Sequence, residues 1–195
     1  MIIGRETRKW RITGLGPAAG VSEYVAAAIS KQAAFFDEVL RKTCPDRGRS
    51  FHNFTRRVGR TYPNDAIIYA NLFCFAWNAG NPLQCKDQAV REKVKRYSEV
   101  LLRAQLRVLK PDIVIFAHGV HRDVVEYRRS LFPTQGPNAA CTESRHYDAD
   151  IGIPKDHLWS CKLPGSIRCF RIQHPSSTSP DAVPAQDYLV ATLMR

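Results

Sequence analysis

Apolar residues along the chain fall into short continuous runs and into longer stretches with helical spacing. The short runs cover residues 1–3, 66–70 and 113–117, and a fourth, residues 167–172, is interrupted by Arg168 and Arg171. A strand that is buried on both faces of a parallel sheet has a short, continuously apolar sequence of this kind. We therefore predict strands at the first three runs, and the fourth run is a further strand whose partner the pattern alone does not define.

The longer stretches repeat apolar residues every three or four positions, which is typical of amphipathic helices. They predict helices near residues 22–40, 51–58, 87–109, 122–131 and 185–194. Ser22 is the expected N-cap of the first helix, and Lys110-Pro111 ends the third because proline disfavours a helical residue before it. Strands that alternate with helices are joined by right-handed crossovers, so the predicted fold class is α/β, with helices on both faces of the sheet.

Residues 133–154 show no clear period, and the sequence predicts no definite conformation for them. The segment contains Arg145, so a binding loop is one interpretation. Beyond it, the runs 158–163 and 167–172 flank Pro164-Gly165. The two runs form a hairpin, or the second of them is the fourth parallel strand, and the sequence leaves both possibilities open.

The charge of the chain points to an anionic partner. Its 195 residues are enough for a substantial core, and we expect a single domain over residues 1–195. Lys and Arg number 29 against 18 Asp and Glu, which gives a formal charge of +11. Such a field attracts phosphate polyanions, so DNA is the first partner to consider. An anionic membrane surface and simple solubility are the two alternatives.

The six cysteines are spread along the chain without any C-x-x-C pair, so the spacings typical of zinc ribbons and iron–sulfur clusters are absent. We expect reduced, structural thiols and neither a metal nor a cofactor. The sequence contains no run of 18 apolar residues, and it does not open like a secretory signal. We therefore expect a soluble, cytoplasmic monomer.

Polar side chains follow the predicted strands. Glu6 comes shortly after the first run, Asn71 directly after the second, and His174 shortly after the fourth. Because ligands of an open parallel sheet bind beyond the carboxyl ends of its strands, we expect these three side chains to converge on one pocket. Each position also has a purely structural interpretation: Glu6 as a solvated turn residue, for example, and Asn71 as a cap that bonds nearby backbone.

Four segments, taken in order, carry a resemblance to a known family. Gly4-Arg5-Glu6-Thr7 is similar to a first motif of the type Gly-Gln-Asp-Pro-Tyr-His, with Glu6 at the aspartate position. Asn71 matches an asparagine that ends the middle strand, residues 110–115 are similar to the third strand with its lead-in, and His174-Pro175-Ser176 matches the last motif. Together these motifs resemble those of the uracil-DNA glycosylase superfamily, and they extend over nearly the whole chain.

The resemblance implies a three-layer α/β/α sandwich with a central four-stranded parallel sheet. It also implies a DNA glycosylase, which hydrolyses the N-glycosidic bond of a flipped-out base and leaves an abasic site. Glu6 would stabilise the cationic sugar and position or deprotonate water, His174 would donate a hydrogen bond to the departing base, and Asn71 would read the base. The residue types suit this chemistry, because breaking the bond develops positive charge on the sugar and negative charge on the base.

Further site residues are expected around these three. Arg5, Thr7 and Arg8 are expected at the base, because they flank Glu6 after the first strand. Contacts with the DNA are expected from four more residues, His118, Arg145, Ser176 and Ser177.

Thr7 and Arg8 depart from the family pattern. They replace a proline and the tyrosine that crowds the five position of a pyrimidine in the uracil-specific members. An open pocket with an arginine favours a pyrimidine whose five position carries a hydroxyl-rich substituent. Excision of such a base would fit defence against modified viral DNA, and plain uracil repair is the close alternative. If Arg8 instead points to the phosphate backbone, it has no part in base choice.

The wedge that would replace an extruded base is unassigned, since residues 177–180 contain no large apolar side chain. Trp10, Phe54 and Phe73 are candidates for stacking on the base, although aromatic residues are more often part of the core. The main alternative function is a catalytically silent module of the same fold that binds nucleic acid or acts as an inhibitor. A basic α/β protein for another phosphate-bearing ligand is a third possibility.

Overall fold

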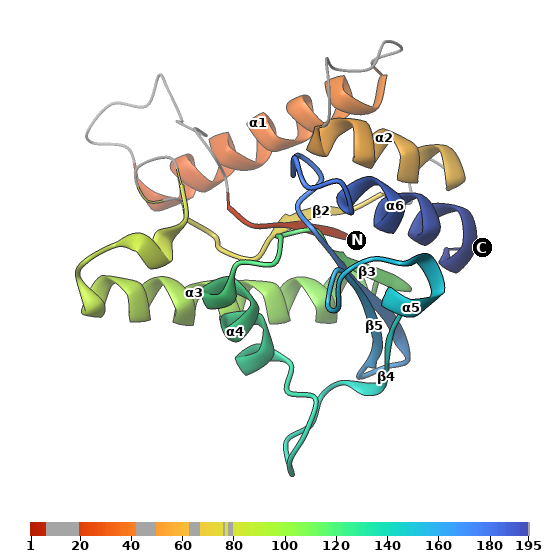
Figure 1. Cartoon of the computed structure of the whole chain (residues 1–195). Coiled ribbons are helices and arrows are strands. Elements are labelled where there is room, and N and C mark those ends of the chain that lie inside the picture. The colour runs from red at the N-terminus through yellow and green to blue at the C-terminus, as the bar shows by residue number, and fades with distance from the viewer. Residues whose placement is uncertain (7–19, 42–49, 63–66, 76, 78–79, 195) are drawn as a thin grey trace.

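The structure, a computed structural model, describes residues 1–6, 20–41, 50–62, 67–75, 77 and 80–194. One open sheet forms the centre of the molecule, with helices on both faces (Figure 1). Its strands are β1 (Ile2–Gly4), β2 (Tyr69–Asn71), β3 (Ile113–Phe116), β4 (Thr142–His146), β5 (Leu158–Leu163) and β6 (Ile167–Ile172). The helices are α1 (Val21–Arg41), α2 (Phe51–Thr61), α3 (Gln88–Leu109), α4 (Arg122–Leu131), α5 (Asp148–Ile151) and α6 (Ala182–Tyr188).

The sheet has the strand order β2-β1-β3-β6-β5-β4 and is mostly parallel. β1 pairs in parallel with β2 on one side and with β3 on the other, and β3 pairs in parallel with β6. β5 and β4 continue the sheet in antiparallel pairing. The expected α/β class is confirmed. The expected four-stranded sheet is not confirmed as such, because the four parallel strands β2-β1-β3-β6 belong to a sheet of six strands.

Of the two additional strands, β4 lies in the segment 133–154 that the sequence left undefined, and β5 is the first arm of the possible hairpin. β6 is both an arm of a hairpin with β5 and a parallel partner of β3, so both interpretations of this run are correct. The hairpin turn contains Gly165 and Ser166, whose φ angles are 80° and 62°. All five residues of β4 are exposed, so its sequence lacks the apolar alternation by which a strand is recognised.

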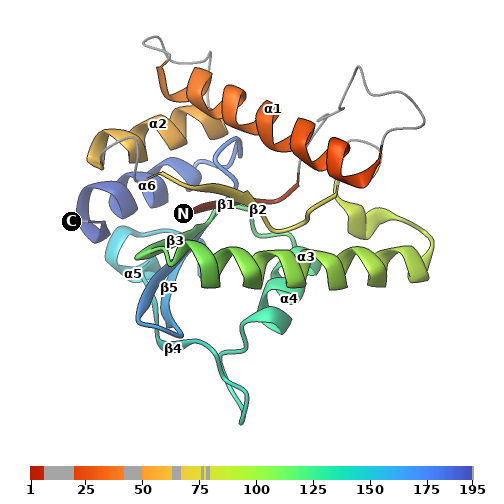
Figure 2. The ribbon, with the colours of Figure 1, turned by 180° about the vertical axis from the view of Figure 1, so that it is seen from behind.

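Each face of the sheet carries its own hydrophobic core. Ile3 of β1 packs in the core with Leu102 of α3 and Val124 of α4, whereas Ile2 packs in the opposite core with Phe54 of α2. Figures 1 and 2 show α1, α2 and α6 on one side of the sheet and α3 and α4 on the other. Because successive strand residues point to opposite faces, a strand between two cores is apolar at every position.

The connections that follow β1 and β3 lie on opposite faces of the sheet. The chain leaves β1 toward α1 and α2, and it leaves β3 toward α4 (Figure 1). In an open α/β sheet, neighbouring strands whose connections diverge in this way border a crevice beyond their carboxyl ends. The topology therefore marks the ends of β1 and β3 as the place for a ligand site.

The predicted helices are present, with differences at their ends. α1 begins at Val21, so Ser22 lies inside the first turn and the prediction that it is the N-cap is wrong. The Glu23 carboxylate accepts a hydrogen bond from the Gly20 backbone N–H at 2.9 Å instead. The last helix starts earlier than predicted and continues from α6 as a π-helical turn, Leu189–Leu193.

Five of the six cysteines lie in the described part of the chain, where all five are free thiols and four are buried. None of the described helices combines the length and the apolar character needed to cross a membrane.

Candidate active site at the carboxyl edge of the sheet

The polar residues singled out in the sequence follow four neighbouring parallel strands. Asn71 is the last residue of β2, opposite Gly4 of β1, and Glu6 lies two residues beyond Gly4. His118 follows β3, and His174 follows β6. All four residues therefore lie at the same edge of the sheet.

A pocket of about 360 Å³ opens at this edge. It is lined by Arg5, Gly119, Val120, His121, Gln173, His174, Ser176 and Ser177. Larger hollows exist elsewhere, such as one of about 560 Å³ between α3 and α4. We place the candidate site at the smaller pocket because the ends of β1, β3 and β6 all contribute to it, at the crevice marked by the topology.

Glu6 is held by its neighbour in the sequence. The Glu6 side chain is only 3% exposed, and that of Arg5 is 16% exposed. The Arg5 guanidinium donates through Nε to Glu6 Oε2 and through Nη2 to Oε1, the latter at 2.9 Å. These hydrogen bonds raise the pKa of Arg5 above its usual value. Both carboxylate oxygens thus have a fixed orientation, with Arg5 between Glu6 and the pocket.

Asn71 is oriented by Tyr69, two residues earlier on the same face of β2. The Tyr69 hydroxyl donates to Asn71 Oδ1 at 2.9 Å. Burial raises the pKa of Tyr69 to about 12, so this hydroxyl stays protonated at neutral pH and remains a donor. A side chain at Gly4 would place its Cβ 2.8 Å from Asn71 Oδ1, so the neighbouring strand needs glycine at this position.

Phe51 connects the ends of β2 and β6. Its ring lies edge-on to Tyr69, with centroids 5.4 Å apart, and its centroid is 5.8 Å from that of His174. A Cβ on Gly4 would also lie 3.5 Å from the Phe51 ring. Phe51 therefore packs both against Tyr69, which orients Asn71, and against His174.

Sequence reasoning missed Phe51 as a site residue and proposed Phe54 and Phe73 instead. Those two side chains are 1% and 0% exposed and belong to the core, so as candidates for stacking they are wrong. The third candidate, Trp10, lies outside the described residues. A signal for Phe51 was available, because a crossover helix runs antiparallel to the strand that follows it. The first residue of such a helix lies near the carboxyl edge of the sheet.

His174 is fixed by the turn that follows it. Its Nδ1 accepts a hydrogen bond from the Ser176 backbone N–H at 3.2 Å, and its carbonyl oxygen accepts one from the Ser177 N–H at 2.7 Å. A neutral imidazole that accepts at Nδ1 carries its proton on Nε2. The turn thus selects the tautomer in which Nε2–H is the donor.

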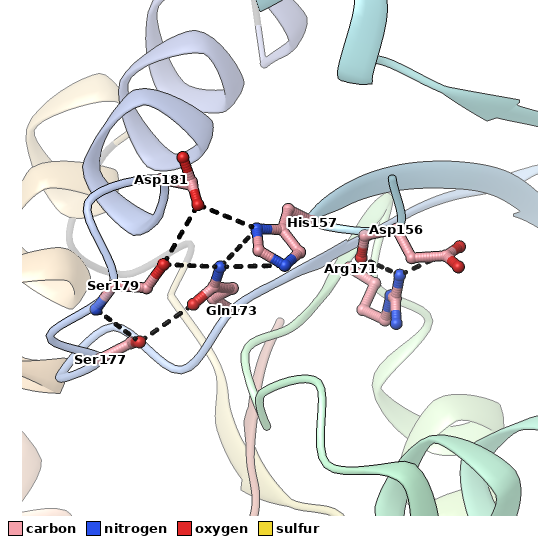
Figure 3. A network of polar contacts seen from close by, with 7 residues as sticks. All are labelled: Asp156, His157, Arg171, Gln173, Ser177, Ser179 and Asp181. Atoms are coloured by element: carbon pink, nitrogen blue, oxygen red, sulfur yellow. Dashed lines mark hydrogen bonds and ion pairs between the residues drawn. The ribbon is translucent and has the colours of Figure 1, made fainter. Parts of the chain in front are cut away.

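A network of hydrogen bonds holds this turn in place (Figure 3). Gln173, which is 4% exposed, accepts at Oε1 from the Ser177 hydroxyl at 2.9 Å, and its Nε2 lies 2.5 Å from His157 Nδ1. Ser179 joins the network through its backbone N–H, which donates to Ser177 Oγ at 3.2 Å, and Asp181 lies beyond it. The Ser177 hydroxyl is thus used to hold the loop, a role that the sequence did not indicate.

Gly119 lies against His174 from the loop after β3. Its φ is 93°, and an added Cβ would lie 3.5 Å from His174 Cβ, which is ordinary van der Waals contact. We expect Gly119→Ala to lower the free energy of unfolding by about 1–2 kcal/mol, because an L-residue is strained at this φ. Chemical denaturation measures the loss.

Gly136→Ala is the matched control for this substitution. Gly136 has a similar φ of 86°, and nothing lies within 4 Å of an added Cβ. Both variants should lose similar stability, and only Gly119→Ala should disturb the environment of His174. A Gly119→Ala protein as stable as the wild type would contradict the strain argument.

Of the three side chains expected to converge on one pocket, His174 is among the described residues that line it, whereas Glu6 and Asn71 lie at the same sheet edge but are not among them. Several of the other expected residues are not placed at the pocket either. His118 is fully buried, so the prediction that it contacts DNA is corrected; burial and the charge of Arg128 hold its pKa well below the usual range. Arg145 lies on the edge strand β4, where it pairs with Asp150 at 3.1 Å. Ser176 is exposed at the pocket rim. Thr7 and Arg8 lie outside the described residues.

Comparisons with protein-family profiles, with curated proteins and with solved structures found no match. Within the described residues, no group of three or more His, Cys, Asp or Glu side chains is arranged to hold a metal ion.

Proposed function

We propose that this chain is a DNA glycosylase that hydrolyses the N-glycosidic bond of a flipped-out uracil or modified pyrimidine and leaves an abasic site. The observation that carries the proposal is the grouping at one sheet edge of a carboxylate, a carboxamide and an imidazole from the ends of β1, β2 and β6. The Phe51 ring packs against Tyr69, which orients the carboxamide, and against the imidazole of His174. The resemblance of the same residues to the motifs of the uracil-DNA glycosylase superfamily supports the same activity.

In the proposed reaction the C1′–N bond breaks and its electron pair leaves with the base. The carboxylate of Glu6 stabilises the positive charge on the sugar and orients the water that adds to C1′. His174 donates its Nε2–H to the carbonyl oxygen on which negative charge develops. The water proton is then available to the released base, so the products are the free base and an abasic sugar.

Base recognition is assigned to Asn71 and Phe51. The Tyr69 hydroxyl donates to Asn71 Oδ1, so the carboxamide uses its oxygen within the protein. We assign its Nδ2 amide group to donate to a carbonyl oxygen of the base. The Phe51 ring, beside His174, offers an apolar face on which an extruded base stacks. The choice between uracil and a five-modified pyrimidine is assigned to Thr7 and Arg8, and a preference for the modified base would fit a role in defence against viral DNA.

The deciding experiment is a screen of oligonucleotides, single-stranded and duplex, with one uracil, hypoxanthine or five-modified cytosine at a defined position. Conversion to an alkali-labile abasic product is expected for at least one base. Faster release of uracil, with no release of a sugar-modified cytosine, would remove the proposed preference and keep the glycosylase activity. No abasic product with any substrate would contradict the enzyme proposal.

One observation favours a second candidate function, a catalytically silent module that binds nucleic acid. Both oxygens of Glu6 accept hydrogen bonds from Arg5, whose positive charge offsets the charge that catalysis would use. In that case DNA containing the target base should bind without any abasic product.

Binding to DNA should depend steeply on salt. The chain carries a formal charge of +11, and each phosphate neutralised by Lys or Arg releases condensed counterions. We expect affinity to fall about tenfold for each doubling or tripling of the salt concentration if several phosphates are contacted. Fluorescence anisotropy with a labelled duplex between about 50 and 200 mM salt measures this slope. An affinity that is nearly independent of salt would exclude binding through phosphates.

A further inference from the structure

A second pocket, of about 400 Å³, lies on the side of the sheet covered by α4. We call it the arginine pocket, and its lining includes Arg128, Arg129, Lys155, Asp156, Trp159 and Arg171. It shares no lining residue with the pocket at His174. The glycosylase proposal gives it no role.

The floor of the arginine pocket is a row of residues across the sheet. Arg171 of β6 pairs in register with Phe116 of β3 on one side and with Trp159 of β5 on the other, and Trp159 pairs with His146 of β4. Residues paired in register share a face of the sheet. The Arg171 side chain, 3% exposed, thus lies between two aromatic side chains.

Arg128 of α4 lies above this row. Its guanidinium carbon is 4.7 Å from the ring centroid of Trp159 and 6.0 Å from that of Phe116, and the residue is only 2% exposed. Aromatic faces attract a cation but accept no strong hydrogen bond from it. Nε and Nη1 of Arg128 and Nε of Arg171 have no hydrogen-bond partner in the described part of the chain.

The charges at this pocket do not balance. Four cationic side chains, Arg128, Arg129, Lys155 and Arg171, line it, and Asp156 is the single carboxylate among the lining residues. Asp156 forms an ion pair with Arg171 (Figure 3), with 3.5 Å between Asp156 Oδ1 and Arg171 Nη2. Among the described lining residues, no carboxylate is then left to pair with Arg128. Burial, followed by repulsion between the two guanidinium groups, lowers the pKa of Arg171 to about 10. Buried cations of this kind are costly unless an anion accompanies them.

We propose that the arginine pocket binds a phosphomonoester, with the phosphate oxygens on Arg128 and Arg171 and the rest of the ligand toward Arg129 and Lys155. A phosphate dianion matches two guanidinium groups in charge and offers several acceptors for their unsatisfied N–H groups. Because both arginines are almost completely covered, only a terminal phosphate reaches them. An internal phosphodiester, which continues on both sides, does not fit. The inference is independent of the glycosylase proposal, since it requires no bond cleavage.

The ligand is either a small phosphorylated molecule or the phosphorylated end of a DNA strand, and the test separates the two. The full chain is titrated with inorganic phosphate, a nucleoside 5′-monophosphate, and matched oligonucleotides with a 5′-phosphate or a 5′-hydroxyl, at constant ionic strength. Binding of phosphate or the mononucleotide, with a rise in Tm, is the expected result. A preference for the 5′-phosphorylated strand over its 5′-hydroxyl counterpart would identify the DNA end as the ligand.

Arg128→Met should weaken this binding about tenfold or more, because hydrogen bonds from a charged donor are lost. Arg122→Gln is the matched control: Arg122 belongs to the same helix, and its side chain is 93% exposed. The control should bind phosphate like the wild type. If Arg128→Met does not fold, Lys155→Gln at the exposed rim provides the test, with a severalfold loss expected. A wild type whose Tm does not respond to phosphate, or a pocket variant with undiminished binding, would overturn the proposal.

Discussion

Replacing Glu6 by Gln should reduce single-turnover base release by on the order of 10²-fold or more, while affinity for DNA changes little. The amide has almost the shape of the carboxylate but lacks the charge that stabilises a cationic sugar. Arg5 keeps one acceptor at the amide oxygen, so the side chain should stay near its present position. Rates are measured with enzyme in excess over a labelled oligonucleotide, and affinity is measured separately by anisotropy.

Glu126→Gln is the control for this experiment, because it removes a carboxylate from an exposed position on α4, where Glu126 pairs with Arg122. Its cleavage rate should equal that of the wild type. If Glu6→Gln cleaves as fast as the control, Glu6 has no catalytic role. A variant that loses DNA affinity in parallel with its rate would assign Glu6 to binding.

Replacing His174 by Ala should also lower the single-turnover rate by about 10²-fold, the usual effect of losing one donor to a developing oxyanion. The Ser176 N–H donates to His174 Nδ1, which places the proton of the neutral imidazole on Nε2. A glutamine at this position has an amide N–H at a similar reach, so His174→Gln should recover part of the lost rate. Equal rates for the wild type and the Ala variant would exclude this role, and equal loss in both variants would indicate a structural one.

The sequence located the candidate site because strand runs and the polar residues after them are local signals. Glu6 and Asn71 follow runs of continuously apolar residues, and His174 follows a run in which four of the six residues are apolar. Parallel strands place their ends together. The residues that orient them depend on contacts between distant segments. Phe51 lies far from His174 in the sequence, and the role of His157 follows only from its contact with Gln173.

The arginine pocket could not be predicted for a similar reason. Arginine is mostly exposed in proteins, so a sequence gives no cause to bury Arg128 or Arg171. Their burial depends on the register that places Phe116, Arg171 and Trp159 side by side. The strand β4 was missed because backbone pairing at the sheet edge, rather than an apolar pattern, defines it.

The position of β1 between β2 and β3 also determines when this site can form during synthesis. Ile2 pairs with Ile115, and β3 in turn pairs with β6, which carries His174 at its end. In a chain that emerges from the ribosome, β1 therefore lacks one of its two neighbouring strands until β3 has been made. The carboxyl edge that carries the candidate site is incomplete until β6 follows. Contacts so distant in sequence slow folding and leave unpaired strand edges exposed in the meantime. The hairpin of β5 and β6, by contrast, joins segments that are close in the sequence and can form as soon as it emerges, and it then presents the edge of β6 with which β3 pairs.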